Sequence, residues 1–403
     1  MSDVAFSRAA AEESRGKENV MIFWNSVSAR LTALLPEQFA LWASLVNRDC
    51  GTGNKAGVDA CGAEAAERLK KLGFSIRFVR YEKAGNLLVA EKGDTSRPFV
   101  LLCGHLDTVY PDGEAAKRPF AVRDGRVTGP GVLDMKGGIA AMLGALDALI
   151  SCGWERHPVK VVLAGDEECG HLLSGAGEDI RHEAEGALYA LNFETGYPDG
   201  SAVLARKGSA FFRIDVTGVG AHAGNNPQDG RSAVVEAAAK TLAVSRLQNL
   251  DAGLSVNVGL IGGGTAPNAV AEHAYCVIDV RFVNEAQYRS VRAALERIAA
   301  ERTVPDTSAS LTELCRMPAM ERTPAAERLL AAVNRTASRL GIPPLGARAV
   351  GGGSDASFIS QAGVPVLCAM GVRGEFNHTE REYALADSLA ERTKLAAGIL
   401  FDL

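Results

Sequence analysis

The sequence predicts an α/β protein with a mixed sheet flanked by helices, into which a smaller ferredoxin-like α+β domain is inserted. Three observations support this prediction. Apolar strand-like runs alternate with helical patterns in the first half of the chain, as in an α/β sheet. From about residue 206 the order becomes β-α-β-β-α-β, which is typical of a ferredoxin-like sandwich. After Pro318 the α/β pattern resumes.

The first half of the chain begins with a stretch at residues 1–18 that we expect to be a flexible leader. Helical spacing of apolar residues then predicts helices at about 20–48 and Ala56–Leu72, and a later Ala- and Leu-rich helix at about Met135–Ile150. The β-rich runs predict strands at Ser75–Tyr81, Asn86–Ala90, Pro98–Cys103, Val159–Ala164 and Ala187–Phe193.

The second half supplies the inserted domain and the remainder of the large one. The strands expected in the insertion are Phe211–Thr217, Ser255–Ile261, Ala274–Phe282 and Ser308–Leu314. Its two helices are expected at about Ser232–Arg246 and Glu285–Ala300. Beyond it we expect a helix at 325–340, a strand at Val364–Met370 and a final helix from Leu385.

Composition limits the class of protein. The 403 residues are 47% hydrophobic and 23% charged, as in ordinary globular proteins. The net charge of 43 − 48 = −5 disfavours a nucleic-acid partner. The eight cysteines are scattered without a CxxC pair, so we expect reduced thiols. No apolar run reaches the roughly 20 residues of a membrane span, and the N-terminus lacks a secretory pattern. We therefore expect a cytoplasmic protein with no membrane partner.

Three predicted strands end in residue types that bind metal ions. His105 and Asp107 follow the first of these strands, Glu167 and Glu168 the second, and Glu194 the third. Ligands of open α/β sheets bind at the carboxyl ends of the strands. One such ending is unremarkable, because strands usually end in polar loops. Three strand ends with histidine or carboxylate residues together indicate a functional site.

Two more residues are candidates for the same site. Asp134 opens a predicted helix, where a helix N-cap is the alternative interpretation. His378 lies in a polar loop before the final helix, where a solvated histidine is the alternative. Two imidazoles and three carboxylates suit two divalent ions such as Zn²⁺. One glutamate of the adjacent pair would then stay free as a general base, and Asp107 would orient His105.

Several motifs resemble the M20 metallopeptidase family, and most closely its carboxypeptidase G2-like glutamate carboxypeptidase branch. The motifs are GHLDTVYP, GPGVLDMKGG, AGDEECG, NFETG, GVGAHAGNNPQDGRSAV, GGGTAPNAV, DVRF, GGGSDAS and NHTEREY. They extend from about residue 40 to the C-terminus in the family's order and spacing. The resemblance implies a zinc-peptidase-like catalytic domain at 1–206 and 318–403, and an inserted dimerisation or lid domain at 207–317.

The resemblance also implies two Zn²⁺ ions per chain. The implied metal ligands are His105, Asp134, Glu168, Glu194 and His378. Asp134 would bridge the two ions, with a cis peptide to Met135. Glu168 and His378 would complete one zinc site and Glu194 the other.

Two carboxylates of the catalytic domain have other implied roles. Asp107 would support the His105 ligand. Glu167 would be the general base that activates water and passes the proton to the leaving amine. The implied reaction is hydrolysis of the amide bond to a C-terminal amino acid, glutamate, in N-acyl or peptidyl substrates with a free carboxylate. An N-acyl-amino-acid deacylase, a desuccinylase and a dipeptidase are alternatives within the family. A degenerate metal-binding scaffold without turnover is the non-enzyme alternative.

The inserted domain has its own implied roles. His222 would reach the active site of a partner subunit and stabilise the oxyanion, which implies a homodimer built through this domain. Asn268 and Arg281 would contact the substrate carboxylate or the oxyanion from this domain, and Ser354 of the catalytic domain would touch the substrate carboxylate. Arg316 would also bind substrate, although it is displaced by one position from the Arg-Pro-Ala of the G2-like proteins.

Overall fold

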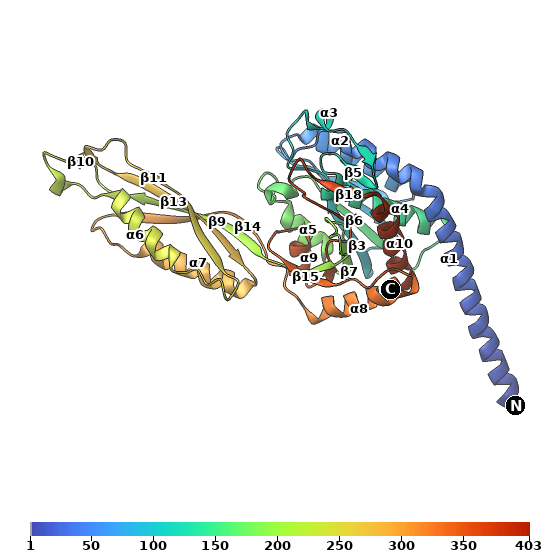
Figure 1. Cartoon of the computed structure of the whole chain (residues 1–403). Helices are drawn as coiled ribbons and strands as arrows, with labels where there is room; N and C mark the ends of the chain where they lie inside the picture. The colour runs from blue at the N-terminus through green and yellow to red at the C-terminus, as the bar shows by residue number, and fades with distance from the viewer. Residues whose placement is uncertain (1) are drawn as a thin grey trace. The chain divides into compact units, whose positions relative to one another are not determined.

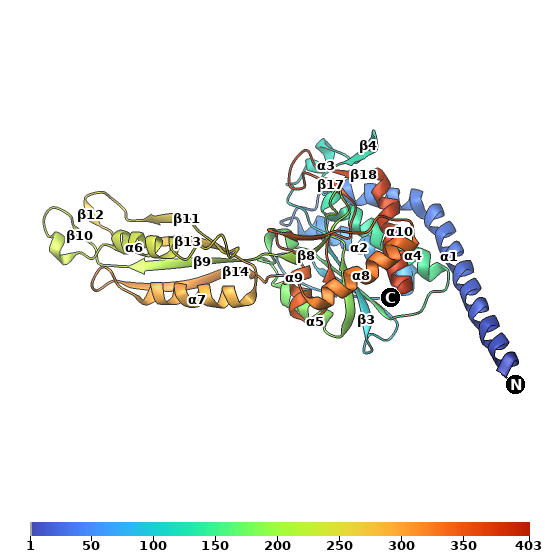
Figure 2. The same cartoon turned by 60° about the horizontal axis from the view of Figure 1, so that its bottom comes forward.

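The computed structural model describes the backbone from residue 2 to residue 403 and the side chains from residue 21 onward. Its contacts divide the chain into two compact units, which Figures 1 and 2 show. The first unit comprises residues 1–204, 323–348 and 362–403, and the second comprises 205–322 and 349–361.

A six-stranded mixed sheet forms the centre of the first unit, in the order β1-β2-β6-β3-β7-β16. Its strands are β1 (Ser75–Val79), β2 (Leu87–Lys92), β3 (Phe99–His105), β6 (Val159–Ala164), β7 (Ala187–Asn192) and β16 (Val366–Leu367). Strands β6, β3 and β7 are parallel neighbours, and β1 and β2 run antiparallel at one edge. Every residue of β3 and β6 is buried, which explains why both strands are mainly apolar in the sequence, with Lys160 as the one charged residue of β6.

The first unit also contains helices. They are α1 (Ser2–Val46), α2 (Lys55–Lys71), α3 (Glu114–Lys117), α4 (Gly137–Ser151), α5 (Ala176–Ala184), α8 (Pro324–Arg339) and α10 (Ala386–Asp402). Helices α1, α4 and α10 pack against one another, as both views of the chain show. Almost all of α4 is buried, because Ala, Gly and Leu let neighbouring helices approach closely. The sequence predicted a flexible leader at residues 1–18. That prediction was wrong from Ser2 onward, because α1 begins at Ser2. Residue 1 lies outside the described residues.

The second unit contains the predicted ferredoxin-like arrangement. Its four-stranded antiparallel sheet has the order β11-β13-β9-β14, from β9 (Gly208–Thr217), β11 (Ser255–Gly263), β13 (His273–Phe282) and β14 (Ser308–Met317). Buried residues alternate along β9 and β13, as expected for a sheet with one covered face. The covering helices are α6 (Ala233–Ser245) and α7 (Glu285–Ala300), whose first turns are capped by Ser232 and Asn284.

Short elements complete both units. They are β4 (Ala121–Arg123), β5 (Arg126–Thr128), β8 (Ala202–Arg206), β10 (Ala221–His222), β12 (Ala269–Val270), β15 (Ala347–Val350), α9 (Ala356–Gln361), β17 (Gly374–Glu375) and β18 (Tyr383–Leu385). The strand expected at Val364–Met370 is only the two paired residues of β16. Residues 349–361, expected from the sequence in the large domain, belong to the second unit. There the Arg206 guanidinium donates to the carbonyls of Gly352 and Gly353, at 3.1 and 2.8 Å.

All eight cysteines lie in the described part of the chain, and none of them is in a disulfide bond there. Among the described residues, none of the helices has the length and apolar character that crossing a membrane requires.

Candidate metal centre

The carboxyl ends of three neighbouring strands meet at one edge of the central sheet. His105 is the last residue of β3 and pairs with Ala164, the last residue of β6. On the other side of β3, Cys103 pairs with Asn192, the last residue of β7. The segments that follow β6 and β7, with Glu167, Glu168 and Glu194, therefore leave the sheet beside His105.

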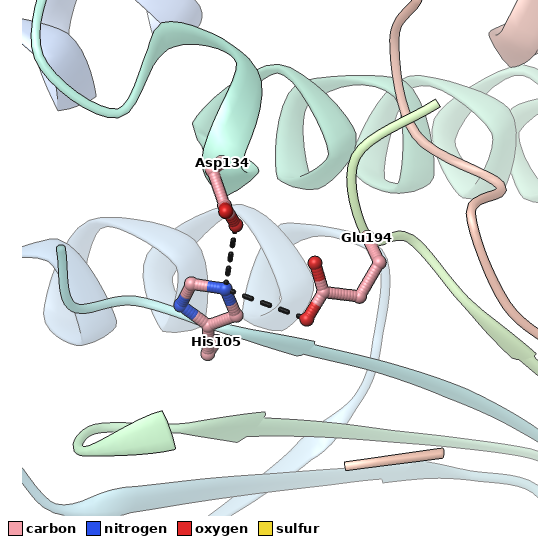
Figure 3. Close-up of side chains that lie close together, drawn as sticks. All are labelled: His105, Asp134 and Glu194. Carbon is pink, nitrogen blue, oxygen red and sulfur yellow. Dashed lines mark hydrogen bonds and ion pairs between the residues drawn. The ribbon is translucent and has the colours of Figure 1, made fainter. Parts of the chain in front are cut away.

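One group of possible metal ligands consists of His105, Asp134 and Glu194. The Nε2 atom of His105 lies 3.1 Å from Oδ1 of Asp134 and 3.6 Å from Oε1 of Glu194. Figure 3 shows one ring nitrogen of His105 facing both carboxylates, with a dashed line to each. All three residues are buried, and their ligand atoms lie close enough together to hold one metal ion.

A second group consists of Asp134, Glu168 and His378. Nε2 of His378 lies 3.2 Å from Oδ2 of Asp134 and 3.0 Å from Oε2 of Glu168. Asp134 therefore belongs to both groups, and its two carboxylate oxygens face different histidines. A hollow of about 450 Å³ opens beside Glu168, lined in part by Thr52 and Tyr110.

Asp134 lies in an irregular segment, Val132–Lys136, immediately before α4. Its peptide bond to Met135 is cis, as the family resemblance implied. The N-cap interpretation of Asp134 was wrong, because α4 begins only at Gly137 and no side chain among the described residues caps it. Instead the Asp134 side chain points to the two histidines, and its Oδ2 also accepts a 2.9 Å hydrogen bond from the Asn377 amide.

Asp107 connects two of the strand ends. Its carboxylate accepts hydrogen bonds from the backbone N–H groups of Glu167 and Glu168, at 3.1 and 3.3 Å, and from the Thr52 hydroxyl at 2.6 Å. Nδ1 of His105 lies 3.1 Å from the Asp107 carbonyl and 3.4 Å from its carboxylate. A proton held on Nδ1 leaves the Nε2 lone pair directed at Asp134, as a metal ligand requires.

The charged groups in this cluster shift one another's pKa values strongly. Although burial lowers it, the pKa of His105 is raised by its contacts with Asp107 and Asp134. Hydrogen bonds to Asp134 and Glu168 raise the pKa of His378 to about 11. Burial and the negative charge of Asp134 raise the pKa of Glu168 to about 7. Carboxylates packed this closely repel one another, and a bound cation would relieve that repulsion.

The residues fit divalent metal ions. Oε1 of Glu168 is buried and has no hydrogen-bond partner within the described part of the chain. An unpaired buried carboxylate oxygen is unfavourable unless another group uses it. Two imidazoles and three carboxylates, with Asp134 shared, are the donor set expected for two ions of the Zn²⁺ type.

The second unit places two predicted residues in one hollow. His222 and Asn268 both line a cavity of about 670 Å³. Nδ1 of His222 accepts hydrogen bonds from the backbone N–H groups of Gly224 and Asn225, at 3.1 and 3.0 Å. The proton of a neutral His222 therefore lies on Nε2, which can donate a hydrogen bond outward.

The other residues predicted to bind substrate have partners within the second unit. The Arg281 guanidinium donates to Asp279 at 2.9 Å. Arg316 forms an ion pair with Glu285, and its guanidinium lies 4.0 Å from the centre of the Tyr288 ring. The Ser354 hydroxyl is buried and accepts from the N–H of Ala356 at the start of α9. Their roles toward substrate stay predictions.

Two polar residues near Asp134 were not predicted from the sequence. The Asn377 amide contacts Asp134 directly, and the buried Glu382 carboxylate accepts hydrogen bonds from the backbone around Asp134. Both flank His378 in the NHTEREY motif, which is the only signal in the sequence that points to them.

This fold and this cluster of ligands define a metal-dependent hydrolase. The model of the peptidase family M20/M25/M40 matches residues 101–402, which is well over half of the chain. The chain belongs to this family of metallopeptidases, which act on peptide-like substrates.

Individual relatives agree with this assignment. The chain is 30% identical over 371 residues to carboxypeptidase G2 of Pseudomonas sp. (strain RS-16), covering 89% of this chain and 87% of the relative. It is 29% identical to a succinyl-diaminopimelate desuccinylase of Xanthomonas campestris, and the match covers 81% of this chain and 89% of the relative. In fold it is similar to aminopeptidase PepT from Bacillus cereus, with a TM-score of 0.73 and 23% identity over 91% of this chain and 98% of that one.

Proposed function

We propose that this protein is a di-zinc carboxypeptidase that hydrolyses the amide bond to a C-terminal glutamate in N-acyl or peptidyl substrates. The observation that carries the proposal is the position of Asp134, shared by two groups of ligands with Glu167 beside them. The proposed ligands are His105, Asp134, Glu168, Glu194 and His378. Zn²⁺ at these ligands would polarise the scissile carbonyl and lower the pKa of water.

Glu167 is the proposed general base. Its backbone is held by Asp107, and its charge contributes to the raised pKa of His105, so its carboxylate is close to the ligand cluster. It takes a proton from the attacking water as the new C–O bond forms. It then gives that proton to the amide nitrogen as the C–N bond breaks, releasing an amine and a carboxylic acid.

The second unit completes the proposed mechanism as a lid and dimerisation domain. We propose that His222 of one copy donates its Nε2 proton to the developing oxyanion in the active site of another copy. The backbone N–H groups that donate to Nδ1 favour the tautomer with its proton on Nε2, which this role requires. Asn268 lines the same hollow and would contact the same substrate group.

Recognition of the released glutamate is assigned to Arg281, with Arg316 and Ser354 as further proposed contacts. The two arginines already have acidic partners in the structure, at Asp279 and Glu285. Substrate carboxylate would have to compete with these acids or bind the remaining N–H groups. Glutamate specificity is supported by the motif resemblance and by the 30% identical carboxypeptidase.

A substrate panel tests the proposal. The metal-loaded protein is assayed with N-acyl-glutamates, folate-like glutamate conjugates, dipeptides and N-acetyl or N-succinyl amino acids. We expect the highest kcat/KM for substrates that release a C-terminal glutamate. Preference for a succinyl group, whatever the amino acid, would favour the desuccinylase alternative, since several relatives carry that name. Preference for basic or neutral C-terminal residues would reject the glutamate carboxypeptidase.

A further inference from the structure

The buried carboxylate of Glu382 lies at the centre of four hydrogen bonds. Its Oε1 accepts from the N–H groups of Leu133 and Asp134, at 2.8 and 3.0 Å. Its Oε2 accepts from the N–H of Gly131 at 3.1 Å and from the Tyr110 hydroxyl at 2.6 Å. Glu382 is 1% exposed, so these bonds are shielded from water.

Two of these donors, the N–H groups of Leu133 and Asp134, belong to the segment Val132–Lys136, and the third backbone donor, Gly131, comes directly before it. That segment is not helical at Asp134 and Met135, so its backbone cannot satisfy these N–H groups by an ordinary helical ladder. Glu382 satisfies them instead. A charged acceptor makes stronger hydrogen bonds than a neutral one, which suits a backbone that must hold an irregular shape.

Glu382 also connects two ligand-bearing parts of the chain. It follows His378 by four residues in one loop, and Asn377 of that loop donates to Asp134. The segment around Asp134 lies almost 250 residues earlier. Glu382 therefore fastens the loop that presents one ligand to the segment that presents the shared ligand.

We propose that Glu382 is a positioning residue that sets the geometry of the metal centre by holding Asp134 and His378 in register. The proposal rests on the metal dependence contained in the proposed function, and not on the identity of the substrate. Groups that orient metal ligands typically change metal affinity or activity by about 10- to 100-fold when they are removed.

Three variants remove different numbers of these hydrogen bonds. Glu382→Gln keeps the shape and one carbonyl oxygen, which can still accept from Leu133 and Asp134. Its amide nitrogen takes the place of Oε2. This nitrogen can donate to the Tyr110 hydroxyl, which can also accept, but it cannot accept from the N–H of Gly131. The N–H of Gly131 therefore loses its acceptor. Glu382→Ala removes the acceptor of all four donors. Tyr110→Phe removes one bond and leaves all three backbone bonds intact.

The test is a metal titration of the full-length, metal-depleted protein with Zn²⁺, in competition with a chromogenic chelator, and with Co²⁺, followed by its visible absorption. The expected metal affinity falls in the order native, Glu382→Gln, Glu382→Ala, with losses of about 10-fold and about 100-fold. Tyr110→Phe should stay close to native. The Co²⁺ bands of Glu382→Gln should differ from native, because the ligands have moved.

The control variant is Glu380→Gln, because Glu380 is an exposed carboxylate in the same loop. This variant should bind metal with native affinity. Thermal unfolding of the metal-free proteins separates positioning from a merely structural role. A lower melting temperature with native metal affinity and native Co²⁺ bands in Glu382→Gln would overturn the proposal. If Glu382→Ala does not fold, Glu382→Gln alone decides. Because the readout is metal binding, a native protein that binds metal but cleaves no amide would refute only the proposed function.

Discussion

The carboxylate of Asp107 accepts a 3.1 Å hydrogen bond from the backbone N–H of Glu167, which joins the end of β3 to the segment after β6. The same carboxylate accepts from Glu168 and Thr52. One acidic side chain thus positions the proposed general base and one proposed ligand together. The side chain of Asp107 is fully buried, so its contribution is not screened by solvent.

Replacing Asp107 by Asn should impair catalysis more than folding. The amide offers one acceptor oxygen where the carboxylate offers two, so one of the N–H groups of Glu167 and Glu168 loses its partner. We expect kcat to fall by about 10- to 100-fold. Steady-state kinetics check this result, with exposed Asp94→Asn as the matched control. An unchanged kcat would show that Asp107 does not position the site.

Replacing Glu167 by Gln should abolish turnover while the metal content stays native. A general base contributes roughly 10²- to 10⁴-fold, and Gln cannot accept the proton from water. Activity assays and metal analysis on the same preparation check both halves of the prediction. Residual activity near the native level would remove the role proposed for Glu167, and loss of metal would make it a ligand.

Replacing Gly138 by Ala should destabilise the first unit. A Cβ atom at Gly138 would overlap the carbonyl oxygen of Phe193, the residue before Glu194. Overpacking of this kind costs about 1–3 kcal/mol, and thermal unfolding measures it. Gly351→Ala is the control, because its Cβ would meet no described atom within 4 Å. Equal melting temperatures for the two variants would contradict this packing.

Replacing Glu183 by Gln should reduce stability in a pH-dependent way. Although burial raises it, the pKa of Glu183 is lowered by Lys160, at 2.8 Å, and by Arg77. A lowered native pKa gives stability that is present above the ordinary value of 4.5 and lost as pH falls through the native value.

The difference in melting temperature between native protein and Glu183→Gln should therefore be largest near neutral pH and shrink below about pH 4. Glu178→Gln is the control on the same helix, because Glu178 is an exposed carboxylate with an exposed partner. A difference that stays constant with pH would contradict the assignment of the pKa shift to this buried cluster.

The sequence predicted the parts of the site that depend on local patterns. Apolar runs followed by His105, by Glu167 and Glu168, and by Glu194 indicated three strand ends, because buried parallel strands have this composition. Neighbouring parallel strands then bring these ends together without further information.

Other parts depend on contacts that no local pattern reveals. The two-residue strands β10, β12 and β17 are too short for alternation to be detected. Glu382 pairs with backbone N–H groups far away in the chain, and any acid in a loop would look the same in the sequence. The pairing of Arg316 with Glu285 is likewise a tertiary contact.

We propose that Asp134 is shared by two metal ions. The most direct test is the metal content of the full-length protein, purified gently with zinc supplied, beside Asp134→Ala and His378→Ala. The account predicts two equivalents of zinc per native chain, loss of both in Asp134→Ala, and retention of about one in His378→Ala, which leaves the group of His105 and Glu194 intact. A native protein without stoichiometric metal, or an Asp134→Ala variant that keeps two equivalents, would contradict it.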